Sequence, residues 1–213
     1  MLNDCMRHLI IKALHRNESF LAEVTEKLTS ELTYSGSKVN IRDLYAENFQ
    51  PVLSRDDFTA LKNNRLPEDI LREQEYLQNA DLLWVIFPIW WTSMPAILKG
   101  YIDRIFLSGF AYRMKSDRLE GLLTNKKVII LNSMGMSREE YTNTGMYEAL
   151  RMTVDKGIFE FTGMQVIDHR YFTSIMSATD KQRKAYLDEV TELARQYAGN
   201  NDFCRDVSKQ FVA

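Results

Sequence analysis

Short, mostly unbroken apolar runs separated by helical patterns constrain this chain more than any other feature. The runs comprise residues 9–11, 82–87, 128–131, and the weaker 166–167 with 171–172. Continuous rather than alternating hydrophobicity is expected of strands that are covered on both faces. A fifth candidate, residues 38–44, alternates more and indicates a strand at the edge of a sheet.

Helical patterns lie between these runs. Residues 19–32 carry one stripe of apolar residues spaced four apart, which predicts a helix. Two more helices are expected over residues 67–79 and 95–106, because each range begins with a proline suited to a first helical turn. Ser93 is a candidate N-cap of the second of these. Further helices are expected over residues 144–161 and 181–197. Strict alternation of strand and helix predicts an α/β fold: a doubly wound, five-stranded parallel sheet with helices on both faces.

No linker, repeat or low-complexity tract interrupts the chain, so residues 1–213 are expected to form a single domain. The polar segment 45–65 is expected to be a surface loop. The tail after Gly199 is expected to be ordered only by contact with something else.

Composition narrows the class of protein. A hydrophobic content of 45% over 213 residues is enough for a real core, and a net charge of −2 without a basic stripe speaks against nucleic acid or an anionic membrane as a partner. Cys5 and Cys204 form no disulfide framework, which is typical of a reducing compartment. The longest apolar stretch, residues 82–91, contains Pro88 and is too short to span a membrane, and no signal peptide opens the chain. We therefore expect a cytoplasmic protein without membrane insertion.

Ligands of an open parallel sheet bind beyond the carboxyl ends of its strands, so the segments that follow the strands are the candidate site. The first candidate segment contains His15, Asn17, Ser19 and Phe20. Asn17 and Ser19 are placed to cap a helix whose free N–H groups would bind a phosphate, although an ordinary cap without a ligand explains them equally well. Neither a GxGxxG fingerprint nor a P-loop is present.

The second candidate segment follows the second long apolar run and consists of Pro88, Ile89, Trp90, Trp91 and Thr92. Flat apolar walls with backbone donors suit the isoalloxazine ring of a flavin. A role for both tryptophans in the core or in a dimer interface is the alternative.

The third candidate segment, Ser133, Met134, Gly135 and Met136, leads to Tyr141 and Tyr147. Gly135 permits close approach of a ring, and a tyrosine there could donate a hydrogen bond to it. Simple packing of the two tyrosines is the alternative. The three histidines are scattered, so no metal site is predicted, and the charged residues 181–184 are expected to be a solvated helix face.

At these segments the sequence resembles the NAD(P)H:quinone oxidoreductase family. The longest and most specific match runs from residue 80 to residue 112, a second match covers residues 43–56, and a weaker one covers residues 11–20. The resemblance implies a flavodoxin-like fold and a flavin, FMN or FAD, with NAD(P)H as electron donor. It also implies ping-pong hydride transfer to quinone-like acceptors and a homodimer.

The resemblance also implies roles for individual residues. Its phosphate loop falls on His15, Asn17, Ser19 and Phe20; its ring wall on Pro88, Ile89, Trp90, Trp91 and Thr92; its turn under the polar edge of the ring on Ser133, Met134, Gly135 and Met136; its catalytic residues on Tyr141 and Tyr147; and its acceptor pocket, across the dimer interface, on Tyr112 and Met114.

This chain departs from the family pattern at several of these positions. Its first loop is one or two residues shorter, Leu21 replaces an asparagine, and the turn at residues 133–136 has lost one glycine. Tyr147 stands where the family has a histidine, and a tyrosine cannot take up a proton to become a cation. A flavin-binding regulatory or ancillary protein with weak oxidoreductase activity is therefore the alternative function.

Overall fold

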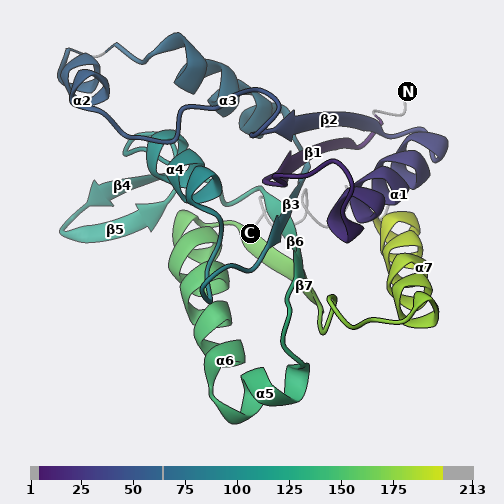
Figure 1. Cartoon of the computed structure of the whole chain (residues 1–213). Coiled ribbons are helices and arrows are strands. Elements are labelled where there is room, and N and C mark those ends of the chain that lie inside the picture. The colour runs from purple at the N-terminus through teal and green to yellow at the C-terminus, as the bar shows by residue number, and fades with distance from the viewer. Residues whose placement is uncertain (1–4, 64, 199–213) are drawn as a thin grey trace.

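Five parallel strands form the central sheet of the computed structural model, which describes residues 5–63 and 65–198. The strands are β1 (Arg7–Lys12), β2 (Lys38–Asp43), β3 (Leu82–Pro88), β6 (Lys127–Ser133) and β7 (Gln165–Phe172), in the spatial order β2-β1-β3-β6-β7 (Figure 1). Counted along the chain, this is the order 2-1-3-4-5 that is typical of flavodoxin-like sheets. The predicted strands are thus confirmed, with β2 at an edge as expected.

Helices cover both faces of this sheet, as predicted. On one face, α1 (Phe20–Tyr34) and α7 (Asp180–Tyr197) bury the stripe that includes Val24 and Leu28 against Trp84. On the other face, α3 (Glu68–Asn79) and α4 (Ala96–Ile105) pack on the opposite side chains of β1 and β3. Because successive side chains of a strand point to opposite faces, the unbroken apolar runs supply both cores at once.

The segment 45–65 is not only a loop, because it contains the short helix α2 (Arg55–Lys62). A capping box between Ser54 and Asp57 starts this helix, and the buried guanidinium of Arg104 on α4 holds Asp57 at 2.9 Å. The stabilising partner is thus 47 residues away in sequence. A local pattern does not reveal such a contact.

Two further departures lie in the second half of the chain. A small antiparallel hairpin, β4 (Tyr112–Lys115) with β5 (Arg118–Gly121), projects from the molecule (Figure 1). After α5 (Arg138–Asn143), the single helix expected over residues 144–161 is instead α6 (Met146–Leu150), a π-helix (Arg151–Phe159) and a 3-10 turn (Glu160–Thr162). Ser93 is not the N-cap of α4, because Pro95 occupies that position.

A β-bulge in the outer strand β7 sets which of its side chains face which layer. Val128 pairs with Val166, but the next residue, Ile129, pairs with Asp168, so β7 carries one extra residue. A one-residue shift moves every later side chain to the other face. His169 and Tyr171 therefore lie on the same side as Val166, facing the π-helix.

None of the helices in the described residues is long and apolar enough to cross a membrane. The C-terminal tail, including Cys204, lies outside the described residues.

Candidate functional site

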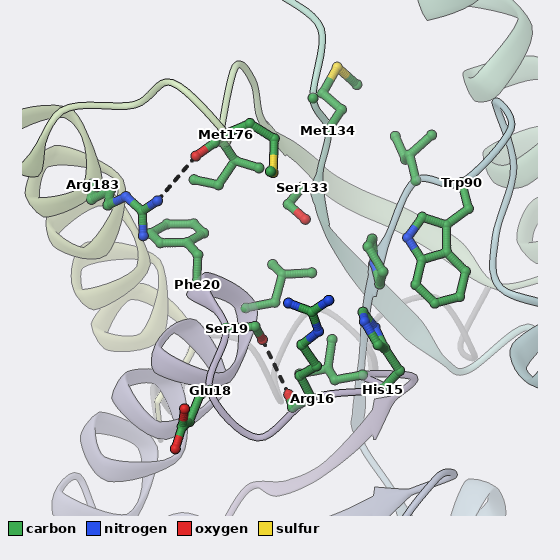
Figure 2. A pocket seen from close by; sticks show the side chains of 16 residues that line it. His15, Arg16, Glu18, Ser19, Phe20, Trp90, Ser133, Met134, Met176 and Arg183 are labelled. Atoms are coloured by element: carbon green, nitrogen blue, oxygen red, sulfur yellow. Dashed lines mark hydrogen bonds between the residues drawn. The ribbon is translucent and has the colours of Figure 1, made fainter.

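A pocket of about 450 Å³ opens at the carboxyl edge of the sheet, where the loops after β1, β3 and β6 meet. Figure 2 shows these loops facing one another, closed on the far side by α7. The predicted residues that line the pocket are His15, Ser19, Phe20, Pro88, Ile89, Trp90, Ser133, Met134 and Gly135. All three candidate segments are thus brought together around one cavity.

One end of the pocket has features that are typical of anion sites. Ser19 caps α1 by accepting a hydrogen bond from the N–H of Ala22 at 3.2 Å. The N–H groups of Arg16 and Glu18, just before the helix, donate to no protein atom of the described residues. The guanidinium of Arg16 points into the cavity beside them (Figure 2). Free N–H groups, a helix dipole and a cation together favour a phosphate.

The wall after β3 is a tight turn over residues 90–93. Trp90 and Ser93 exchange two backbone hydrogen bonds of 2.9 and 3.0 Å, and Trp91 and Thr92 adopt φ values of +50° and +55°. Left-handed backbone at two residues other than glycine stores strain, which is common at binding sites. The N–H groups of Trp91 and Thr92 donate to no described protein atom.

This turn separates the two tryptophans. The Trp90 indole faces the cavity and meets the His15 ring edge-on at 5.0 Å, whereas Trp91 is 100% exposed and does not line the pocket. The structure therefore offers one indole as a wall, not two. Because the two left-handed residues reverse the chain, adjacent side chains point in different directions.

The pocket floor after β6 consists of Met134, whose side chain is buried, and Gly135, which faces open space. The Met134 side chain turns away from the cavity and is buried with Tyr141, Leu150 and Tyr171 (Figure 2). A Cβ added at Gly135 would meet only the Cγ of Met176, at 4.0 Å. The protein's own packing therefore leaves the space above Gly135 open to a ligand.

The other predicted site residues lie outside this pocket. They are Asn17, Trp91, Thr92, Met136, Tyr141, Tyr147, Tyr112 and Met114. Asn17 lines an adjoining cavity of about 420 Å³, which shares Ser19 and Arg183 with the pocket. Tyr112 and Met114 lie on the β4–β5 hairpin. The roles assigned to all eight residues stay predictions.

Tyr141 and Tyr147 belong to a small buried cluster next to the floor. The cluster includes Met134 and Ile89, which also line the pocket. The Tyr147 ring packs at 4.7 Å from the Tyr171 ring, and the Arg138 guanidinium lies over it at 5.1 Å. The two tyrosines thus lie next to the pocket floor, although neither lines the pocket itself.

Sequence reasoning missed several residues that line the pocket. Arg16 follows His15 directly and could have been found from its charge in a phosphate loop. Arg183 falls in the run expected to be a solvated face, yet it lines the pocket and donates to the Ile175 carbonyl at 3.2 Å. Ile175 and Met176 carry no local signal, because only the fold brings the loop after β7 to the pocket. In residues 5–63 and 65–198, no three His, Cys, Asp or Glu side chains gather as a metal site requires.

Comparison with known proteins places the chain in a family. The model of a family with a flavodoxin-like fold matches residues 6–194. A Haemophilus influenzae protein named "Uncharacterized NAD(P)H oxidoreductase" is 36% identical over 193 residues, which cover 90% of this chain and 93% of the relative. The rat ribosyldihydronicotinamide dehydrogenase [quinone] is 31% identical over 199 residues, covering 84% of this chain and 86% of the relative.

The solved structures agree with these relatives. The NAD(P)H:quinone oxidoreductase from Methanothermobacter marburgensis superposes with a TM-score of 0.81 at 28% identity and covers 90% of this chain and 98% of its own. The matched residues include all three loops around the pocket. The chain therefore belongs to the flavodoxin-like NAD(P)H:quinone oxidoreductase family.

Proposed function

We propose that this protein is a flavin-dependent oxidoreductase that transfers hydride from NAD(P)H to quinone-like acceptors in a ping-pong cycle. One observation carries the proposal: a phosphate-type anion site and a flat indole wall lie in one pocket at the carboxyl edge of the sheet. A flavin has the matching parts, an anionic tail and a planar ring.

The residues present fit such a cofactor. Arg16 and the N–H groups before α1 would hold its phosphate, and Trp90 with Ile89 would wall its ring. Trp91 and Thr92 do not line the pocket, but they directly follow Trp90, and their unpaired N–H groups would serve the polar edge of a ring that extends past this residue.

The bound flavin would supply the redox chemistry, accepting a hydride from the nicotinamide and passing it to the acceptor. In the overall reaction, NAD(P)H, a proton and a quinone become NAD(P)⁺ and a hydroquinone. The protein would hold and orient the ring, and it would place hydrogen-bond donors where charge develops. We assign this donor role to the hydroxyls of Tyr141 and Tyr147, next to the pocket floor.

We further propose a cytoplasmic homodimer in which Tyr112 and Met114 of one subunit contribute to the acceptor pocket of the other. The support is the resemblance to the family together with the exposed side chain of Met114 on a projecting hairpin. Two scattered cysteines suit a reducing compartment.

Flavin content and steady-state kinetics test the proposal. Purified protein is expected to carry or take up a flavin, and the mass of the flavin released by heat identifies FMN or FAD. With menadione as acceptor, double-reciprocal plots against NAD(P)H are expected to be parallel. Intersecting lines would rule out a shared site, and a protein that takes up no flavin would rule out the proposal itself.

Arg16→Met tests the anion site directly. Removing a charge-assisted contact to phosphate is expected to weaken flavin affinity roughly 10- to 150-fold, since such bonds contribute on the order of 1.5–3 kcal/mol. The binding constant is read from quenching of flavin fluorescence. Lys62→Met, an exposed residue on α2, removes the same charge away from the pocket and is the matched control. Equal affinity of both variants would mean that Arg16 does not bind the phosphate.

The alternative is a flavin-binding regulatory or ancillary protein with weak turnover. The tyrosine at position 147 and the turn with a single glycine favour it. Flavin uptake with negligible NAD(P)H oxidation in the presence of several acceptors would support this alternative.

A further inference from the structure

A cluster of four buried polar side chains lies directly beneath the pocket floor, and nothing in the proposed cycle uses it. Asn132 on β6, His169 and Tyr171 on β7, and Asp155 on the π-helix converge there. The side chains of His169 and Asp155 are only 4% and 5% exposed. Asn132 immediately precedes two residues that line the pocket, Ser133 and Met134.

The Asn132 amide determines where the protons of this cluster lie. Its Nδ2 donates to the carbonyl of Phe87 at 3.0 Å, and a carbonyl only accepts. The Oδ1 of Asn132 therefore faces His169, whose Nε2 lies 2.6 Å away. Because Oδ1 is also only an acceptor, Nε2 must carry a hydrogen.

The other ring nitrogen of His169 requires a second proton. Its Nδ1 lies 2.6 Å from Oδ1 of Asp155. A neutral imidazole has one N–H, which Nε2 already uses, so a carboxylate facing a bare Nδ1 would be repulsive. One additional proton, held between His169 and Asp155, satisfies both contacts. The pair is then electrically neutral as a unit.

Several charged groups surround this pair. Burial lowers the pKa of His169 and Arg151 adds to that effect, whereas Asp155 and Asp168 oppose it. Arg151 Nε lies 3.5 Å from the outer carboxylate oxygen of Asp155. Burial and Asp155 raise the pKa of the Tyr171 hydroxyl, so this group stays protonated.

Two irregular elements bring the pair together. The β-bulge turns His169 and Tyr171 toward Asn132, and the π-helix presents Asp155 from the opposite side. π-helical turns are rare and are frequently found at functional sites. A cluster assembled by two such departures from regular structure is more than ordinary core packing.

The cluster contacts the proposed flavin pocket along two routes. Asn132 ties β6 to the Phe87 carbonyl, directly before the wall formed by Pro88 and Ile89. The Tyr171 hydroxyl lies 3.1 Å from Nδ1 of His169, and its ring packs on that of Tyr147. The pocket wall and the ring of Tyr147 are thus both connected to the His169–Asp155 pair, through Asn132 and Tyr171 respectively.

We propose that Asp155 and His169 form a positioning dyad that holds one shared proton and thereby orients Asn132 and Tyr171 beneath the flavin pocket. The kinetic consequence of this dyad rests on the proposed function, but the shared proton does not. The dyad itself transfers no group and touches no substrate.

Histidine-selective ¹⁵N NMR of the full chain, with and without added FMN or FAD, tests the shared proton. The chain has only three histidines, so His8→Gln and His15→Gln assign the spectrum. At neutral pH we expect a protonated Nε2 and a strongly deshielded proton at Nδ1 for His169, and a single N–H for His8. A single N–H and no deshielded proton at His169 would overturn the proposal, whether or not the protein binds flavin.

Asp155→Asn tests the effect of the dyad on the pocket. An amide cannot share the proton. Its Nδ2 can instead donate to a bare Nδ1, which leaves His169 as a neutral ring with its one hydrogen at Nε2. We expect kcat to fall roughly 2- to 30-fold, as is typical of residues that act through others, with little change in flavin affinity. Asp188→Asn, which removes the same charge from an exposed position on α7, is the matched control. If Asp155→Asn binds flavin and turns over like this control, the positioning role is wrong.

Discussion

Two buried histidines occupy opposite faces of the same sheet, and their surroundings differ completely. His8 lies near the amino end of β1, and its Nδ1 accepts a hydrogen bond from the Trp84 indole at 3.0 Å. Its Nε2 has no partner in the described residues. His169 lies toward the carboxyl end of β7, and both of its nitrogens face acceptors.

This difference teaches that burial alone does not decide what a histidine does. A second proton on His8 would have to displace the Trp84 donor, and burial lowers its pKa to about 4. His169 is equally buried, yet its partners require a second proton nearby. Of these two buried histidines, only His169 lies next to the pocket, through its contact with Asn132.

The largest expected effect comes from breaking the polar pair. His169→Ala leaves the buried Asp155 carboxylate without its closest partner, and removing one member of a buried pair typically costs about 3–5 kcal/mol of unfolding free energy. Urea denaturation at neutral pH measures this cost. A loss below about 1 kcal/mol would show that Asp155 is not charged against His169, and the contrast with His8 would disappear.

Acid is expected to act mainly through His8. Its folded pKa of about 4 lies below the ordinary 6.5, so the unfolded chain binds the proton first. The neutral ring therefore contributes stability above pH 6.5 that is lost as pH falls toward 4, about 3 kcal/mol in total. His8→Gln should remove this part of the pH dependence of urea denaturation. An unchanged pH dependence would show that another group carries the effect.

The smallest expected effect on the difference between His8 and His169 comes from the tryptophan that donates to His8. Trp84→Phe removes the indole N–H that donates to His8, which is expected to cost about 1 kcal/mol of unfolding free energy, and the smaller ring leaves a cavity that adds to this cost. The pKa of His8 should rise from about 4, because its Nδ1 no longer accepts a bond. An NMR titration of the His8 ring measures this shift, with His169 as the internal reference. No rise would mean that burial acts alone.

Much of the fold and part of the site follow from local patterns. The apolar run at residues 82–87 becomes the fully covered β3, and Ser19 caps α1 as its position suggests. The three loops after the strands meet at one pocket, because the carboxyl ends of parallel strands share an edge. By contrast, Trp90 and Trp91 point in different directions because the backbone turns through left-handed conformations at Trp91 and Thr92. The sequence does not predict this turn, because neither residue is a glycine.

The parallel sheet, its two helical layers and the loops that carry the site can be predicted from local patterns, because burial on both faces leaves a continuous apolar signal. The contacts of His169 with Asp155 and Asn132 cannot, because these residues lie 14 and 37 positions away along the chain and meet only in the folded protein. The β-bulge in β7 and the π-helix at residues 151–159 bring these side chains together. The hydrophobic period of the sequence reveals neither element. Each is a single departure from the regular strand or helix, and long-range packing imposes that departure.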